Sequence, residues 1–143
     1  LKTHCPYFHL WILCMDDLTY TILSKMQPES VSLISLVEFE DKELLAIKST
    51  RTHQEYCWTC TPSLPLYIFA KNQKIKKLAY VDTDIYFYSS LDPIFQEFKN
   101  SSVMIIPHRF VPSTRHLEPL AGTYNVSMLI FNRDVNGLKC LTW

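Results

Sequence analysis

The chain has 143 residues, of which 48% are hydrophobic, so it can bury the core of one globular domain. Its 14 basic and 14 acidic residues give a formal net charge of zero. Such a chain lacks the net positive charge that attracts a protein to nucleic acid or to an anionic membrane surface, and we expect no nucleic-acid partner.

Five cysteines are scattered among apolar neighbours, an odd count that indicates reduced thiols rather than a disulfide framework. We therefore expect a cytoplasmic protein. No uncharged run is long enough to span a membrane. The chain begins at Leu1, and the apolar pattern of a helix still runs at Trp143, so we expect a piece of a longer protein.

The first 48 residues alternate between predicted strands and helices. Phe8–Met15 is an apolar run that predicts a buried strand, and Asp16 after it is a typical helix N-cap. Apolar residues on one face of 18–26 predict a helix, and Ser30–Leu36 predicts a second strand. Glu38–Lys48 predicts one further helix. Its residues expected to pack inward are Leu44, Leu45 and Ile47.

Helical spacing continues through Ser49–Asn72, but Pro62 and Pro65 interrupt it and predict a kinked or two-part helix. Cys57 and Cys60 lie at the spacing of a zinc or redox pair. A single pair without a second, and without a preceding strand, favours cysteines that pack in the core.

Two acidic residues end the next strand. The short apolar run at 78–81 predicts a buried strand, followed by Asp82, Thr83 and Asp84. Because side chains alternate along extended chain, we expect both carboxylates to project to one side. Paired carboxylates at the carboxyl end of a strand are suited to Mg²⁺ or Mn²⁺, and such an ion can hold a diphosphate.

The chain then alternates again. A Ser-Leu-Asp-Pro sequence opens a predicted helix that runs to Phe98, and 102–106 predicts a strand. Pro107–Gly122 has no periodicity and is a candidate functional loop, which His108 and Arg109 open. Solvated loop residues are the alternative.

A last strand is predicted at Thr123–Phe131, followed by a helix that Asp134 caps. Asn125 lies near the start of the strand, and a buried amide there must either bond local backbone or face a ligand. The chain has only two glycines, which excludes a glycine-rich phosphate loop within it.

Five segments of the chain, taken in sequence order, resemble those of one protein family. They are Glu55-Tyr56-Cys57-Trp58-Thr59, Tyr80-Val81-Asp82-Thr83-Asp84-Ile85-Tyr86-Phe87, Pro107-His108-Arg109-Phe110, Tyr124-Asn125-Val126 and Gly137-Leu138 with Cys140, Leu141 and Trp143. The chain is similar in these segments to the nucleotide-diphospho-sugar transferases, GT-A-fold glycosyltransferases related to the glycogenin-like family, family 8. The similarity extends over nearly the whole chain.

The resemblance implies an α/β protein with a three-layer, Rossmann-like GT-A fold, incomplete at both ends, in which residues 1–143 form a single partial domain. It implies a glycosyltransferase that takes a nucleotide-diphosphate-sugar donor, transfers its sugar to an unknown acceptor, and uses Mn²⁺ or Mg²⁺. The metal residues would be Asp82 and Asp84. The implied substrate-binding residues are Arg51, Asp82, Thr83, Asp84, His108 and Asn125.

The chain departs from the family pattern in places. Ser127 replaces the usual glycine two residues after Asn125. The first strand with its nucleotide-binding loop, the downstream Asp-Gln pair and the late metal-binding histidine are not found, so we expect this segment alone to be inactive.

Two other readings stay open. A phosphohydrolase of the haloacid dehalogenase type also ends a strand in Asp-x-Asp, although Tyr86 occupies the position where that motif has Thr or Val. A non-catalytic or degenerate domain that binds a nucleotide-sugar is the second.

Overall fold

Two separate β-sheets organise the chain, one parallel and one antiparallel. A computed structural model describes residues 1–143 as two units, Leu1–Ile68 and Phe69–Trp143, and we describe each by itself. Both units combine helices with strands, which confirms the mixed α/β class. These sheets do not by themselves form the single sheet of a Rossmann-like fold, so the GT-A fold and the single partial domain stay predictions.

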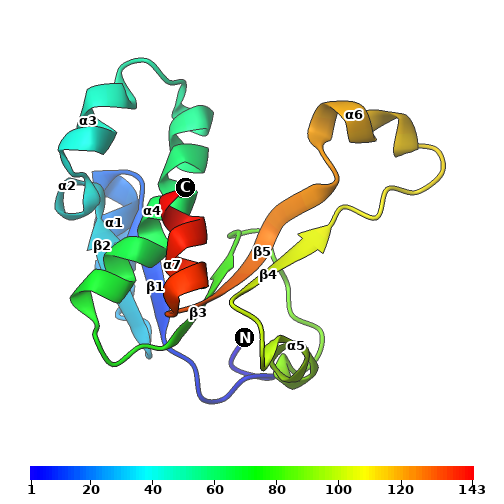
Figure 1. The fold of residues 1–143 in the computed structure, drawn as a ribbon. Helices are drawn as coiled ribbons and strands as arrows, with labels where there is room; N and C mark the ends of the chain where they lie inside the picture. Colours follow the sequence, from blue (N-terminus) through cyan, green and yellow to red (C-terminus); the bar gives the residue numbers. More distant parts are fainter. The chain divides into compact units, whose positions relative to one another are not determined.

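In the first unit, β1 (Leu10–Cys14) pairs in parallel with β2 (Val31–Ser35), and α1 (Asp17–Met26) connects the two strands (Figure 1). Both strands and the helix agree with the sequence-based prediction. The Asp16 side chain accepts a hydrogen bond of 2.7 Å from the Thr19 backbone N–H, so it is the predicted N-cap. The predicted apolar face of α1 is nevertheless only partly covered, since Leu23 is half-buried whereas Leu18 and Met26 are exposed.

The predicted helix at Glu38–Lys48 is wrong as a single element, because the structure has two helices there. They are α2 (Leu36–Phe39) and α3 (Lys42–Lys48). Asp41 lies between the two helices and is the N-cap of α3. Its carboxylate accepts hydrogen bonds from the backbone N–H groups of Glu43 and Leu44. Leu44 is buried as expected, whereas Leu45 is exposed.

A single helix, α4 (His53–Lys71), follows and carries both Pro62 and Pro65 inside it. The two-part alternative is therefore wrong. Thr52 and Glu55 form a reciprocal capping box, in which the Thr52 N–H donates to the Glu55 carboxylate at 2.7 Å. Cys60 is buried and Cys57 half-buried, and all five cysteines of the structure are free thiols.

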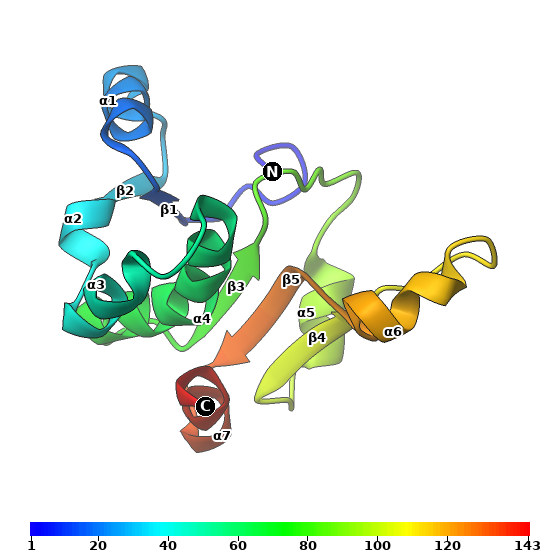
Figure 2. The ribbon, with the colours of Figure 1, turned by 90° about the horizontal axis from the view of Figure 1, so that it is seen from above.

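In the second unit, β5 (Tyr124–Asn132) is the central strand of an antiparallel sheet (Figure 2). The strand β3 (Lys77–Val81) pairs with it on one side and β4 (Val103–Pro107) on the other. Because both outer strands run opposite to β5, their carboxyl ends lie at the same end of the sheet. The predicted acidic pair follows β3 at this end.

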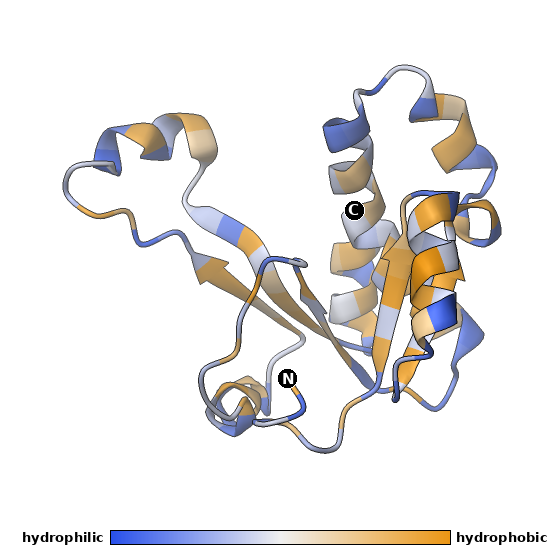
Figure 3. Cartoon of the chain, turned by 180° about the vertical axis from the view of Figure 1, so that it is seen from behind, coloured by the Kyte–Doolittle hydropathy of each residue, from blue (hydrophilic) through white to orange (hydrophobic).

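One face of this sheet packs against α5 (Asp92–Phe98), the helix predicted to open at a Pro in its first turn. Phe98 and Ile130 are fully buried, and Met128 completes the cluster. Figure 3 colours β4 and β5 as predominantly hydrophobic, in agreement with this packing. The core therefore holds the middle of β5 and leaves its first residues, beginning at the exposed Tyr124, outside.

The loop between β4 and β5 is more ordered than the sequence predicts. It contains a 3-10 helix, η1 (Arg115–Leu117), which leads into α6 (Glu118–Ala121). Both helices are too short to show a helical period in the sequence, which is why neither was predicted.

The last helix, α7 (Val135–Thr142), begins at the predicted cap, Asp134. Its carboxylate accepts from the Gly137 N–H at 2.8 Å and from the Ser102 hydroxyl at 3.0 Å. Gly137 is needed for close approach, because a Cβ atom there would lie 2.0 Å from the Asn132 carbonyl oxygen.

None of the helices combines the length and the hydropathy that crossing a membrane requires.

Candidate functional site

The acidic pair lies in a turn that begins where β3 ends. The Ile85 backbone N–H donates to the Asp82 carbonyl oxygen at 3.3 Å, which closes a turn over 82–85. Before the turn, the Asp82 N–H donates to the Ser127 carbonyl oxygen at 3.0 Å. Asp82 is thus still tied to the central strand, while Thr83 and Asp84 extend beyond the sheet.

The Asp82 side chain is held by a residue of its own strand. The Tyr80 hydroxyl donates a hydrogen bond of 2.9 Å to Oδ1 of Asp82. Side chains two residues apart in a strand lie on the same face, which is why these two can meet. The contact orients one carboxylate oxygen.

The turn changes one part of the sequence argument. Side chains alternate only along extended chain, and the chain stops being extended after Asp82. The expected same-side arrangement of Asp82 and Asp84 therefore no longer follows from strand geometry. What the turn does provide is exposure, since Asp84 and Thr83 are exposed and Asp82 is half-buried.

No basic side chain neutralises the pair. The two salt bridges of the structure, Lys2–Glu29 and Lys48–Glu40, both lie in the first unit. Lys77, the first residue of β3, places its ammonium group over the Phe95 and Phe98 rings. Both carboxylates are consequently available to a cation from solution.

The donor set fits a cation that is shared with a ligand. No group of three or more His, Cys, Asp or Glu side chains could enclose a metal ion by itself. Mg²⁺ and Mn²⁺ take hard oxygen ligands, and Mg²⁺ is usually bound through one or two carboxylates together with water and substrate phosphates. Asp82 and Asp84, with the Thr83 hydroxyl between them, match that incomplete set.

Two other predicted residues lie at the same end of the sheet. Asn125 Oδ1 accepts a hydrogen bond of 2.7 Å from the Ser127 N–H. Of the two roles expected for this amide, its oxygen therefore has the first, a bond to local backbone. The His108 N–H donates to the Thr123 carbonyl oxygen at 2.9 Å, just beyond the end of β4. Ser127 and Thr123 are four residues apart, or about 13 Å along an extended strand.

Arg51 belongs to the first unit, where it is exposed in the bend before α4. Its charge acts there on Glu55, whose pKa is lowered first by the hydrogen bonds from Thr52 and also by this neighbouring guanidinium. The expected diphosphate contact of Arg51 stays a prediction.

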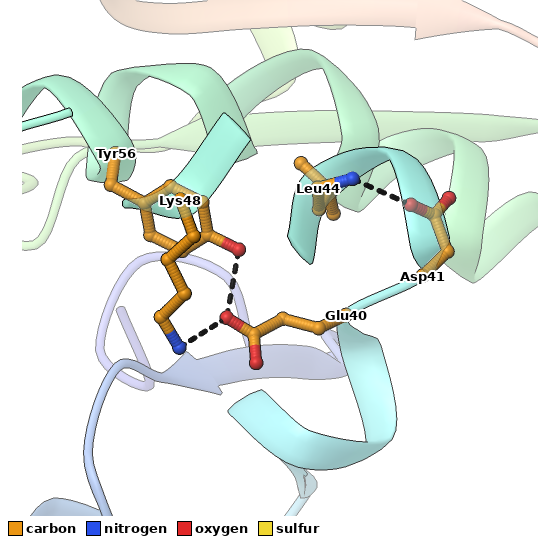
Figure 4. Close-up of polar contacts among 5 residues, drawn as sticks. All are labelled: Glu40, Asp41, Leu44, Lys48 and Tyr56. Atoms are coloured by element: carbon orange, nitrogen blue, oxygen red, sulfur yellow. Dashed lines mark hydrogen bonds and ion pairs between the residues drawn. The ribbon is translucent and has the colours of Figure 1, made fainter. Parts of the chain in front are cut away.

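A polar cluster around Glu40 in the first unit was not predicted from the sequence (Figure 4). One Glu40 oxygen accepts from the Tyr56 hydroxyl at 2.7 Å and pairs with the Lys48 ammonium group, and the Glu40 side chain is only 7% exposed. Burial, together with the bond to Glu40, raises the pKa of Tyr56. A neutral tyrosine that donates to a buried carboxylate is a structural element rather than a reactive one.

Comparison with known proteins identifies two curated relatives, both from Bacillus subtilis strain 168 and both described as uncharacterized. YfnD is 36% identical over 129 residues, which is 90% of this chain and 42% of YfnD. YfnF is 32% identical over 140 residues, which is 94% of this chain and 46% of YfnF. The chain thus spans less than half the length of each. No family model and no solved structure matches the chain.

Proposed function

We propose that this chain is the metal-binding part of a GT-A glycosyltransferase that transfers a sugar from a nucleotide-diphosphate-sugar to an acceptor. The observation that carries the proposal is the Asp82-Thr83-Asp84 turn at the end of β3, where two carboxylates have no basic partner. The ordered series of segments similar to the nucleotide-diphospho-sugar transferases supports it.

The residues of the turn would act as follows. Asp82 and Asp84 hold Mn²⁺ or Mg²⁺, and the Tyr80 hydroxyl keeps the Asp82 carboxylate in one orientation. The ion, when bound, neutralises the negative charge that gathers on the departing nucleoside diphosphate. The exposed Thr83 contacts the diphosphate from the same turn.

His108 and Asn125 lie at the same end of the sheet and would contact the sugar part of the donor. The diphosphate role of Arg51 rests on the resemblance alone. The Asn125 amide nitrogen is the group that remains for the ligand, because its oxygen is bonded to the Ser127 N–H. The five free thiols support a reducing compartment, and a cytoplasmic location is part of the proposal.

One assay separates this function from the alternatives. The 143-residue chain, and a longer protein that contains it, are incubated with Mn²⁺ and a panel of nucleotide-diphosphate-sugars. Free nucleoside diphosphate from the longer protein supports sugar transfer or donor hydrolysis, and its loss in Asp84→Asn assigns the metal residue. Binding without product supports the non-catalytic domain. Release of inorganic phosphate supports the phosphohydrolase and contradicts our proposal.

A further inference from the structure

A second polar site lies in the loop between β4 and β5. Residues from both ends of this loop and from its two short helices line a half-open cavity of about 210 Å³. Its lining residues are Pro107, Arg109, Phe110, Arg115, Glu118 and Thr123. Figure 1 shows that this loop extends beyond the antiparallel sheet, with α6 on the arm that returns to β5.

Two cationic side chains line this cavity, and neither is in an ion pair. Both Arg109 and Arg115 are exposed, and neither guanidinium forms an ion pair within 4.0 Å. Glu118 lines the same space, so one carboxylate remains beside two guanidinium groups. Arginine presents planar donors that match the oxygens of a phosphate or a carboxylate.

The backbone at the cavity is strained. Arg109 has a φ of 52°, one of three residues other than glycine with a positive φ in the structure. This conformation is costly for a residue with a Cβ atom, and such strain is concentrated at binding sites. The rings of His108 and Phe110, on either side of Arg109 in sequence, stack with centroids 4.8 Å apart. This stack fixes the segment from which Arg109 reaches the cavity.

We propose that the cavity binds a small polyhydroxylated oxyanion, such as a sugar that carries a phosphate or a carboxylate. The oxyanion is bound by Arg109 and Arg115. Glu118, which would repel a bare anion, accepts a hydrogen bond from a hydroxyl group of the same ligand. The volume lies below the usual range of small-molecule pockets, so the cavity holds one monosaccharide-sized group at most. None of this depends on the Asp82 and Asp84 turn.

The test uses the 143-residue chain labelled with ¹⁵N and titrated with glucose 6-phosphate, glucuronate, inorganic phosphate and glucose. We expect saturable shifts of the Phe110 and Thr123 amides with the first or second probe, and affinity about tenfold or more above that for glucose. The first two probes distinguish a phosphate from a carboxylate. Glu118→Ala, which removes the hydrogen-bond acceptor, should weaken binding of the charged sugar and not that of inorganic phosphate.

Arg115→Gln should reduce the affinity for the charged sugar about tenfold, whereas Lys99→Gln, which removes the same charge from an exposed site in the same unit, should not. Arg109→Gly separates binding from folding, because it relieves the positive φ and removes the guanidinium together. It should raise Tm and weaken binding. Equal affinities in wild type, Arg115→Gln and Arg109→Gly, or an equal loss in Lys99→Gln, would overturn the proposal.

Discussion

The Tyr80 hydroxyl donates a 2.9 Å hydrogen bond to Oδ1 of Asp82, two residues further along β3. One carboxylate of the proposed metal site is therefore oriented before any ligand arrives. A hydroxyl that orients a metal-binding carboxylate in this way raises the affinity for the metal without contacting the metal itself.

Tyr80→Phe should weaken Mn²⁺ binding about tenfold, because it removes the hydroxyl and leaves the ring in place. Electron paramagnetic resonance of free Mn²⁺ measures the Kd, and circular dichroism checks the fold. Tyr86→Phe is the matched control, since Tyr86 is exposed and makes a ring contact with Tyr88 instead. Identical Mn²⁺ affinity in Tyr80→Phe and wild type would remove the orienting role of Tyr80.

Gly137→Ala should destabilise the second unit by more than about 2 kcal/mol, because the new Cβ would overlap the Asn132 carbonyl oxygen. Asn136→Ala is the control, because Asn136 is exposed in the same helix, and it should change stability by no more than about 0.5 kcal/mol. Urea unfolding gives both values. A Gly137→Ala protein as stable as Asn136→Ala would mean that the strand and helix are not this close.

Tyr56→Phe should lower the free energy of unfolding by about 1–3 kcal/mol, because the Glu40 carboxylate loses a buried hydrogen bond. The same substitution at Tyr7, which is 97% exposed, should have no effect. Both variants are compared by urea unfolding followed through tryptophan fluorescence. Equal stability of the two would show that Glu40 relies on Lys48 alone.

Alkaline pH should destabilise the first unit. Burial raises the pKa of Cys60 to about 11, and burial with the bond to Glu38 raises the pKa of Tyr67 to about 12. Because these pKa values lie above those of the unfolded chain, the stabilisation is complete below pH about 9 and decreases as pH rises toward 12. Urea unfolding across this range measures the slope.

Tyr67→Phe should flatten that slope above pH about 10, where the unfolded tyrosine would ionise. A slope that is the same in wild type and Tyr67→Phe would mean that Tyr67 ionises equally easily in the folded protein.

The sequence predicts elements well where a local signal decides them. The caps Asp16 and Asp134 start their helices as expected, because a carboxylate that bonds the first turn is a local interaction. Asp41 was the exception, since its capping role depends on the Glu38–Lys48 segment breaking into two helices. Phe39 and Leu44 are buried on the two sides of that break, and the spacing of apolar residues does not reveal it.

Long-range features were less accessible. The placement of Asp82 at a strand end could be predicted, but the turn after it and the antiparallel pairing of β3 depend on β5, almost fifty residues later in the chain. The Glu40 cluster likewise joins residues that are sixteen positions apart. The Arg109 and Arg115 cavity was missed because only the folded loop brings its two ends together.

The most direct test is Mn²⁺ binding to the 143-residue chain in the presence of a nucleoside diphosphate. Electron paramagnetic resonance compares wild type, the Asp82→Asn and Asp84→Asn double variant, and Glu97→Gln as an exposed acidic control in the same unit. We predict one site in wild type and Glu97→Gln, tightened by the nucleoside diphosphate and weakened about tenfold or more in the double variant. Equal Mn²⁺ affinity in all three proteins would contradict the proposed metal site.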